Sequence, residues 1–244
     1  MSGFALYFTN LMNYFTAIGF TCYAPDIMGH GERAYIDVSK KSVHDYVRDM
    51  AEFVRFVEAR HSAPPVIVGH SMGGLIAAKL AEYSSVGHTV LITPAPPKGV
   101  MFVPGRFIQH IFSGIIRAIL FALRGERFVP SERALNTLFV DPEKSKDAIA
   151  MLLRHRINTE SPFVAFELGT SCVQVNKNMI KTPMLVIGAA KDTLIHPSVA
   201  ERIARHLGGE FHMLQDLGHM CPFEAGWEET AKVIHEWLKK AQVR

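Results

Sequence analysis

The sequence predicts an α/β protein in which a mostly parallel sheet is flanked by helices. Short runs rich in apolar and β-branched residues alternate along the chain with longer segments of helical periodicity, as in βαβ units. The 244 residues are enough for one domain with a substantial core. Hydrophobic residues make up 48% of the chain and charged residues 20%, which is typical of a folded globular protein.

The individual elements follow from local patterns of residues. Apolar positions at helical spacing predict an amphipathic helix from Val43 to Arg60. Pro197 and the pair Gly208-Gly209 bracket a helix over 198–207, because proline favours helix starts and glycine favours helix ends. A closing helix is expected over 227–240. Strands are expected over 19–24, 65–68, 88–93, 183–187 and 210–214.

A different pattern separates the strands at 88–93 and 183–187. Residues 95–180 contain no convincing strand, whereas Ser131, Asp141-Pro142 and Ser161-Pro162 are all suitable helix starts. We therefore expect a core formed by residues 1–94 and 181–244, with residues 95–180 inserted as a helical cap over a site.

The most apolar helix of this insertion is expected over 106–123, with a broad apolar stripe. Three interpretations of the stripe remain open. It can pack the cap onto the main domain, or line a pocket for an acyl or other apolar group. It can also dock on a membrane surface, helped by Arg106, His110, Arg117 and Arg124.

Composition excludes several classes of function. A net charge of +3 without a basic stripe argues against nucleic-acid binding. The most apolar run is interrupted by Gln109, His110 and Arg117, so no integral membrane segment is expected. The sequence has neither paired-cysteine spacing nor an H-E-x-x-H motif, so no metal is implied. No cofactor is indicated either. Three widely spaced cysteines suggest reduced thiols in the cytoplasm.

The most informative segment is Gly69-His70-Ser71-Met72-Gly73, which has the pattern G-x-S-x-G. It lies between a predicted strand and the helix-forming run 74–80. A serine on such a strand-to-helix turn takes a strained backbone conformation, and glycines allow the neighbouring chain to pack closely. The positive end of the following helix can stabilise negative charge on a reacting oxygen. This context predicts that Ser71 is a nucleophile.

Two downstream residues can complete the chemistry, because a serine hydroxyl needs a base, and the base needs an acid to orient it. Asp192 follows the strand at 183–187, and His219 lies between the last strand and the closing helix. The alternatives are that Asp192 only anchors a turn or caps a helix, and that His219 is an ordinary surface histidine.

Three other histidines are weaker candidates. His30 lies in a glycine-rich turn and is expected to be structural. His70 is expected to support the serine turn rather than to act as the base. His196 is the rival base because it is close to Asp192 in the sequence, and geometry must decide between it and His219.

Together these segments resemble the α/β-hydrolase superfamily, in its branch of capped serine hydrolases, over nearly the whole chain. The resemblance implies that Ser71 is the nucleophile, His219 the general base and acid, and Asp192 the orienting carboxylate. It also implies that the backbone N–H of Met72 is one oxyanion donor. The segments that carry it are Tyr23–Asp26 with Gly29–Gly31, Gly69–Gly74, Thr93–Gly99, Gly188–Pro197 and Gly218-His219.

The start of the chain departs from this family. Members usually pass through about three strands that end in His-Gly, and the next residue supplies the second oxyanion N–H. Here Met1–Phe8 resembles the stretch directly after that His-Gly, so Met1 takes the donor position and the N-terminal strands are missing. We expect either a start codon assigned too late or a truncated chain; the alternative is a short chain whose sheet has an exposed edge.

The resemblance predicts a hydrolase of small to medium apolar carboxylic esters. Thioester, lactone, amide and carbon–carbon bond hydrolysis, and cofactor-free perhydrolysis, use the same residues, because a fold and a triad do not fix the substrate. The alternative from another class is a ligand-binding or catalytically impaired relative. The oligomeric state is not predicted.

Overall fold

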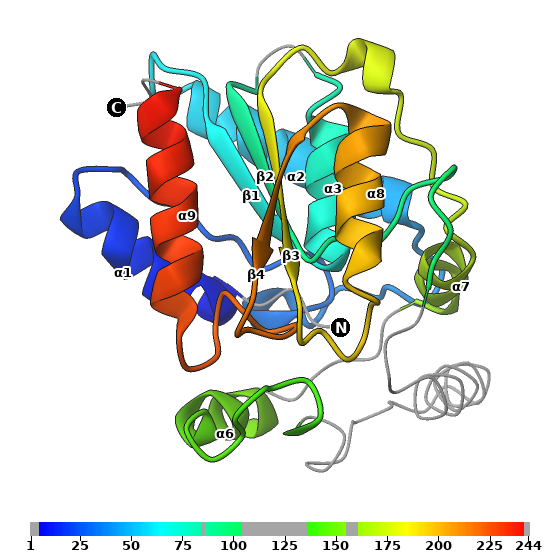
Figure 1. Cartoon of the computed structure of the whole chain (residues 1–244). Coiled ribbons are helices and arrows are strands. Elements are labelled where there is room, and N and C mark those ends of the chain that lie inside the picture. Colours follow the sequence, from blue (N-terminus) through cyan, green and yellow to red (C-terminus); the bar gives the residue numbers. More distant parts are fainter. Residues whose placement is uncertain (1–4, 84–85, 104–135, 155–160, 242–244) are drawn as a thin grey trace.

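The computed structural model describes residues 5–83, 86–103, 136–154 and 161–241 (Figure 1). In this part of the chain one sheet contains four strands in the order β1-β2-β3-β4, and all three neighbouring pairs are parallel. The carboxyl ends of all four strands therefore meet at one edge of the sheet. The strands are β1 (Val66–His70), β2 (His88–Ile92), β3 (Met184–Ala189) and β4 (Glu210–Leu214).

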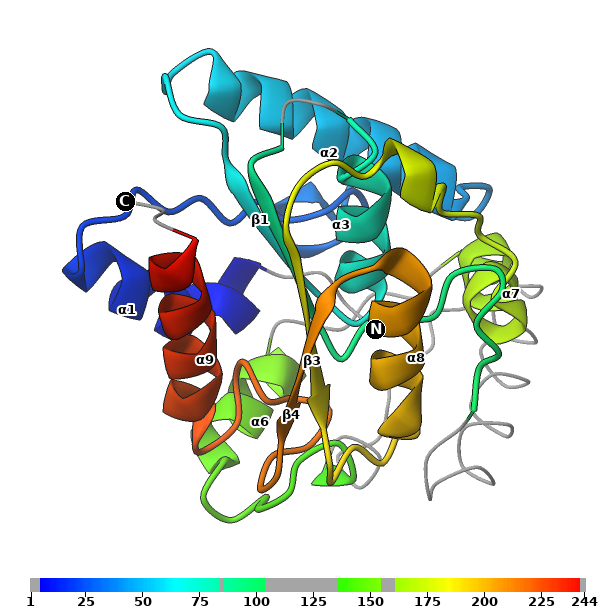
Figure 2. The same cartoon turned by 45° about the horizontal axis from the view of Figure 1, so that its top comes forward.

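Helices cover both faces of this sheet, as Figures 1 and 2 show. One face carries α2 (Val43–Glu58), α3 (Met72–Leu80) and α8 (Ser198–Leu207). The other face carries α1 (Thr9–Ala17) and α9 (Trp227–Lys240), which contact each other. Short 3-10 helices are η1 (Ala5–Phe8), η2 (Gly31–Arg33) and η3 (Lys177–Met179).

The two central strands divide their side chains between two hydrophobic clusters. Leu91 of β2 and Val186 of β3 belong to the cluster under α2, α3 and α8. Their neighbours Val90 and Ile187 belong to the cluster under α1 and α9. All four side chains are fully buried, because successive residues of a strand point to opposite faces and both faces are covered. This explains why the strands read as continuous apolar runs.

The predicted fold class is confirmed, and most predicted elements lie within two residues of their observed bounds. The strand expected over 19–24 is wrong, because Gly19 lies in a turn and the segment pairs with no described strand. Its side chains do alternate as in a strand. Phe20 and Cys22 pack on the hydrophobic cluster under α1 and α9, and Thr21 and Tyr23 are exposed. The residue pattern thus predicted the alternation of buried and exposed side chains. It did not predict that the segment has no hydrogen-bonded strand beside it.

Between β2 and β3 the described residues contain helices and no strand: α6 (Lys146–Arg154) and α7 (Pro162–Thr170). Helix α7 begins as expected, with the Ser161 hydroxyl accepting a hydrogen bond from the N–H of Phe163 at 3.1 Å. Helix α6 begins later than Pro142, because Asp141 instead closes a turn by accepting from the N–H of Lys144. Ser131 and the helix expected over 106–123 lie outside the described residues.

The turn from β1 into α3 shows which glycines the close packing requires. A Cβ atom on Gly69 would lie 2.1 Å from the carbonyl oxygen of Gly73, and one on Gly74 would lie 2.7 Å from Cβ of Pro94. A Cβ atom on Gly73 would meet nothing within 4 Å. The requirement for glycine therefore falls on Gly69 and Gly74, and the second glycine of G-x-S-x-G is not sterically required.

We predict that Gly69→Ala lowers the free energy of unfolding by about 2 kcal/mol or more, because overpacking a rigid backbone contact typically costs 1–3 kcal/mol. The matched variant Gly73→Ala should be neutral or stabilise the protein by up to about 1 kcal/mol, since alanine favours a helix. Chemical denaturation of both variants measures the difference. Equal effects of the two substitutions would contradict this steric account.

Candidate active site

Ser71 lies in the turn between β1 and α3 with a backbone φ of 55° and ψ of −120°. This conformation with positive φ is costly for a serine, so the surrounding structure must hold it. The N–H of Ser71 donates to the carbonyl of Ile92 at 2.9 Å, and the N–H of Ala95 donates to the carbonyl of Ser71 at 3.0 Å. The end of β2 thus fixes both sides of the strained residue.

The structure brings the three predicted residues Ser71, Asp192 and His219 together. Asp192 follows β3 and His219 follows β4, so both loops leave the same edge of the sheet as the serine turn. His219 Nε2 lies 3.1 Å from Ser71 Oγ, and His219 Nδ1 lies 2.8 Å from Asp192 Oδ2. All three residues are buried. This is the geometry in which an imidazole can accept a proton from a hydroxyl while a carboxylate orients its other nitrogen.

Asp192 is fixed by the backbone of its own loop. Its Oδ1 accepts hydrogen bonds from the N–H groups of Leu194 and Ile195, at 2.8 and 2.9 Å. Its Oδ2 faces the ring of His219. Asp192 therefore anchors a turn, as one alternative supposed, and the same turn leaves its second oxygen directed at the imidazole.

The backbone of His219 is held by two residues from neighbouring strand ends. His70 Nε2–H donates to the carbonyl oxygen of His219 at 2.7 Å, and the Thr93 hydroxyl donates to the same oxygen at 3.3 Å. Loss of solvent around the His70 ring lowers its pKa to about 3, with the nearby His219 as a smaller cause. His70 is therefore a neutral donor that supports the site, as expected.

The N–H of Met72 begins α3, where the first N–H groups of a helix have no partner within the helix. The described residues give it no other hydrogen-bond partner. It is therefore an available donor beside Ser71. Met1, the second predicted donor, lies outside the described residues.

The remaining histidines lie elsewhere. His30 is buried in the turn before η2, where its Nδ1–H donates to the carbonyl of Met28 at 3.0 Å. The rival base His196 is exposed and its Nδ1 pairs with the Ser198 hydroxyl at 2.9 Å. The geometry therefore favours His219 over His196 as the base.

Two residues at the site were missed by the sequence reasoning. Thr93 directly follows β2 with a φ of 39°, and its hydroxyl reaches the His219 carbonyl, which its sequence position does not reveal. Glu224 is buried, and its Oε1 accepts from the N–H of Gly218 at 2.6 Å. The available signal was an acidic residue directly after the apolar run 220–223.

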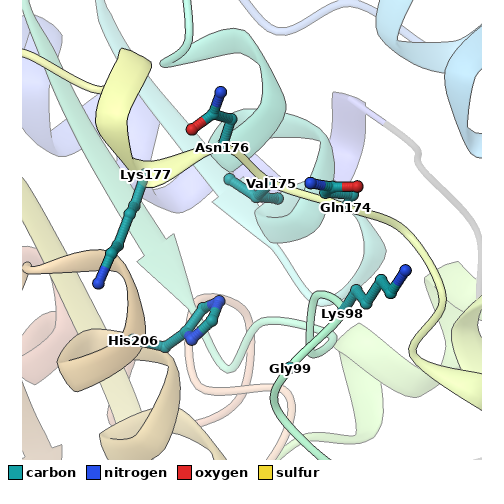
Figure 3. Close-up of a pocket in the computed structure, with 7 residues that line it drawn as sticks. All are labelled: Lys98, Gly99, Gln174, Val175, Asn176, Lys177 and His206. Atoms are coloured by element: carbon teal, nitrogen blue, oxygen red, sulfur yellow. The ribbon is translucent and has the colours of Figure 1, made fainter.

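A cavity of about 240 Å³ lies away from these residues, near the carboxyl end of α8 (Figure 3). Figure 3 shows His206 between the side chains of Lys98 and Lys177, and the two lysine side chains point in different directions. None of Ser71, Asp192 and His219 lines this cavity. Its lining residues are Lys98, Gly99, Gln174, Val175, Asn176, Lys177 and His206.

None of the described helices is both long and apolar enough to cross a membrane. In the same part of the chain, no group of three or more His, Cys, Asp or Glu side chains could hold a metal ion. Cys22, Cys172 and Cys221 are free thiols.

The fold and the serine turn define a serine hydrolase of the α/β-hydrolase class. Residues 3–226 match the family model described as serine aminopeptidase, S33, and the chain belongs to this family. Among curated proteins it resembles the 3-hydroxybutyrate-oligomer hydrolase of Cupriavidus necator. The two are 27% identical over 219 residues, covering 82% of this chain and 73% of the relative.

Solved structures share the fold at low sequence identity. An esterase from Thermogutta terrifontis superposes with a TM-score of 0.73 and 19% identity, over 97% of this chain and 85% of the esterase. A monoacylglycerol lipase from Paleococcus ferrophilus gives a TM-score of 0.66 and 19% identity, over 95% of this chain and 88% of the lipase. These structures confirm the α/β-hydrolase fold.

The low pKa of His70 predicts a component of acid sensitivity. Between pH 6.5 and about 3 the unfolded chain binds a proton on His70 that the folded chain does not, so stability falls as pH decreases through this window. His70→Gln keeps an N–H donor without this titration, and its stability should fall less steeply. His44→Gln, on the exposed face of α2, is the control. Unfolding free energies measured across this pH range test the prediction, and parallel curves for wild type and His70→Gln would contradict it.

Proposed function

We propose that this protein hydrolyses small to medium apolar carboxylic esters through an acyl-enzyme on Ser71. The observation that carries the proposal is the continuous chain of short contacts from Asp192 Oδ2 to His219 Nδ1 and from His219 Nε2 to Ser71 Oγ. The relatives support a hydrolase. One of them is named for 3-hydroxybutyrate oligomers, and hydroxy acids are joined in an oligomer by ester bonds.

The first half of the reaction transfers the acyl group to the enzyme. His219 Nε2 takes the proton of Ser71 Oγ while Oγ attacks the ester carbonyl carbon. The carbonyl oxygen becomes an oxyanion that accepts a hydrogen bond from the N–H of Met72. When the tetrahedral intermediate collapses, the bond to the alcohol oxygen breaks and His219 gives its proton to the leaving alcohol.

The second half returns the enzyme to its starting state. A water molecule gives a proton to His219 Nε2 and its oxygen attacks the acyl carbon of the acyl-enzyme. The second tetrahedral intermediate collapses, the bond to Ser71 Oγ breaks, and His219 returns the proton to that oxygen. Asp192 stabilises the positively charged imidazole in both halves through its bond to Nδ1.

The proposal includes a cap formed by residues 95–180 over the core of residues 1–94 and 181–244. Helix α6 lies beyond the carboxyl ends of β3 and β4 (Figure 1). Phe139, Ile149 and Leu152 pack with Met220 and Phe223, the latter two in the loop that carries His219. This apolar surrounding suits an apolar substrate better than a charged one.

A second candidate reaction is amide hydrolysis, which the description of the family as a serine aminopeptidase favours. The same residues would attack an amide carbonyl, and the leaving group would be an amine. Comparison of p-nitrophenyl esters with aminoacyl p-nitroanilides separates the two, since both release a coloured product. We expect higher kcat/KM for the esters.

We predict that a fluorophosphonate probe adds once to the wild-type protein and does not add to Ser71→Ala. The substitution should lower kcat on p-nitrophenyl esters by about 10⁴-fold or more, because the nucleophile is lost while binding remains. Intact-mass analysis counts the adducts. Ser39→Ala, at an exposed position, is the control, and it should keep both the single adduct and the wild-type kcat.

An adduct that persists in Ser71→Ala would overturn the assignment of the nucleophile. A folded wild-type protein without an adduct and without turnover would favour the ligand-binding or catalytically impaired alternative. Circular dichroism of each variant establishes that it is folded.

A further inference from the structure

Glu224 is a buried carboxylate that the proposed reaction does not use. It is 1% exposed and lies five residues after His219, between the His219 loop and α9. Burying a carboxylate is costly, so a buried one needs hydrogen-bond donors. Glu224 has them in two segments that are far apart in the sequence.

The two carboxylate oxygens of Glu224 accept hydrogen bonds from two different backbone segments. Oε1 accepts from the N–H of Gly218, the residue directly before His219, at 2.6 Å. Oε2 accepts from the N–H of Val140 at 2.8 Å, in the insertion between β2 and β3. The two segments touch, since a Cβ atom on Gly218 would lie 3.0 Å from Cγ2 of Val140. One side chain thus joins the His219 loop to the insertion.

Neighbouring contacts extend this joint to the loop that carries Asp192. The hydroxyl of Thr193, the next residue after Asp192, donates to the carbonyl of Thr137 at 2.6 Å. The N–H of Ala225 donates to the hydroxyl of Ser145 at 3.2 Å. Residues 137–145, which we call the brace, therefore contact the loops of both the acid and the base.

We propose that Glu224 is a positioning residue that holds the His219 loop against the brace, so that the imidazole stays in register with Ser71. This inference rests on the function proposed above. Glu224 bonds to the N–H of Gly218, directly before His219, whereas His70 and Thr93 donate to the carbonyl oxygen of His219 itself. Glu224 supplies the counterpart to these bonds on the insertion side.

The charges around Glu224 agree with such a role. Burial raises the pKa of Glu224, and the N–H groups of Val140 and Gly218 partly offset this. The titratable groups that face it are His219, Asp192 and Cys221. A carboxylate near His219 also favours the positive charge that the imidazole acquires during the reaction.

The test compares Glu224→Gln, Glu224→Ala and the control Glu228→Gln, which makes the same charge change at an exposed position four residues away. Glutamine keeps the shape of the side chain but presents an amide N–H₂ to one of the two N–H donors. We expect kcat on p-nitrophenyl esters to fall about tenfold in Glu224→Gln and about 100-fold in Glu224→Ala, because small displacements of a catalytic group have effects of this size. KM should stay within about threefold, since a positioning residue does not touch the substrate.

Hydrogen exchange of the backbone amides provides a readout that does not depend on activity. The amides of Gly218 and Val140 should exchange faster in Glu224→Gln than in wild type, and Glu228→Gln should leave them unchanged. The near-isosteric glutamine variant carries the test if the alanine variant does not fold.

Each outcome distinguishes the positioning role from the proposed function. Wild-type kcat in folded Glu224→Gln, or a loss confined to KM, would overturn the positioning role while the ester hydrolase stands. If wild-type protein neither turns over esters nor reacts with a fluorophosphonate, the proposed function and its dependent positioning role both fail, and faster exchange in Glu224→Gln would then show a structural joint only.

Discussion

The strained, positive-φ backbone of Ser71 is the constraint on which the site depends. A serine adopts this conformation at an energetic cost, and the cost is met by bonds that tie the residue to the end of β2 through Ile92 and Ala95. The parallel register of β1 with β2 places those partners beside the turn. Because Gly69 and Gly74 permit the close approach of α3 and Pro94, the strain at one residue is supported by packing that only the whole sheet provides.

The two buried carboxylates of the site are likewise held by hydrogen bonds from the backbone. Asp192 and Glu224 each accept hydrogen bonds from backbone N–H groups of the loops they lie in or beside. A carboxylate bonded in this way fixes the path of a loop without a regular element. Asp192 keeps one oxygen for His219, whereas Glu224 uses both oxygens on the backbone. Loops can therefore hold His219 Nε2 at 3.1 Å from Ser71 Oγ, a separation that the proposed proton transfer requires.

The predictable part of the structure is the part that local patterns determine. Periodicity gave the helix beginning at Val43, and the bracketing residues Pro197 and Gly208 gave α8. The strand expected over 19–24 failed because pairing depends on a neighbour that the segment itself does not encode. The positions of Asp192 and His219 directly after predicted strands indicated which side chains meet Ser71. Thr93 was missed because its partner His219 lies 126 residues away. Glu224 was missed because its two partners, Gly218 and Val140, lie in separate segments. Such contacts have no regular sequence spacing that could be recognised.

The sheet and the insertion between β2 and β3 contribute different parts of the proposed site. The residues proposed for the chemistry lie on loops that leave the carboxyl edge of the sheet, and the sheet fixes where these loops begin. The insertion, which we propose as the cap, meets those loops at Thr137, Val140 and Ser145. A substitution elsewhere in the insertion can reshape a substrate pocket and leave these three contacts intact. A substitution at the contacts acts on the acid and base loops instead, so selectivity and turnover should be separable by position within the same segment.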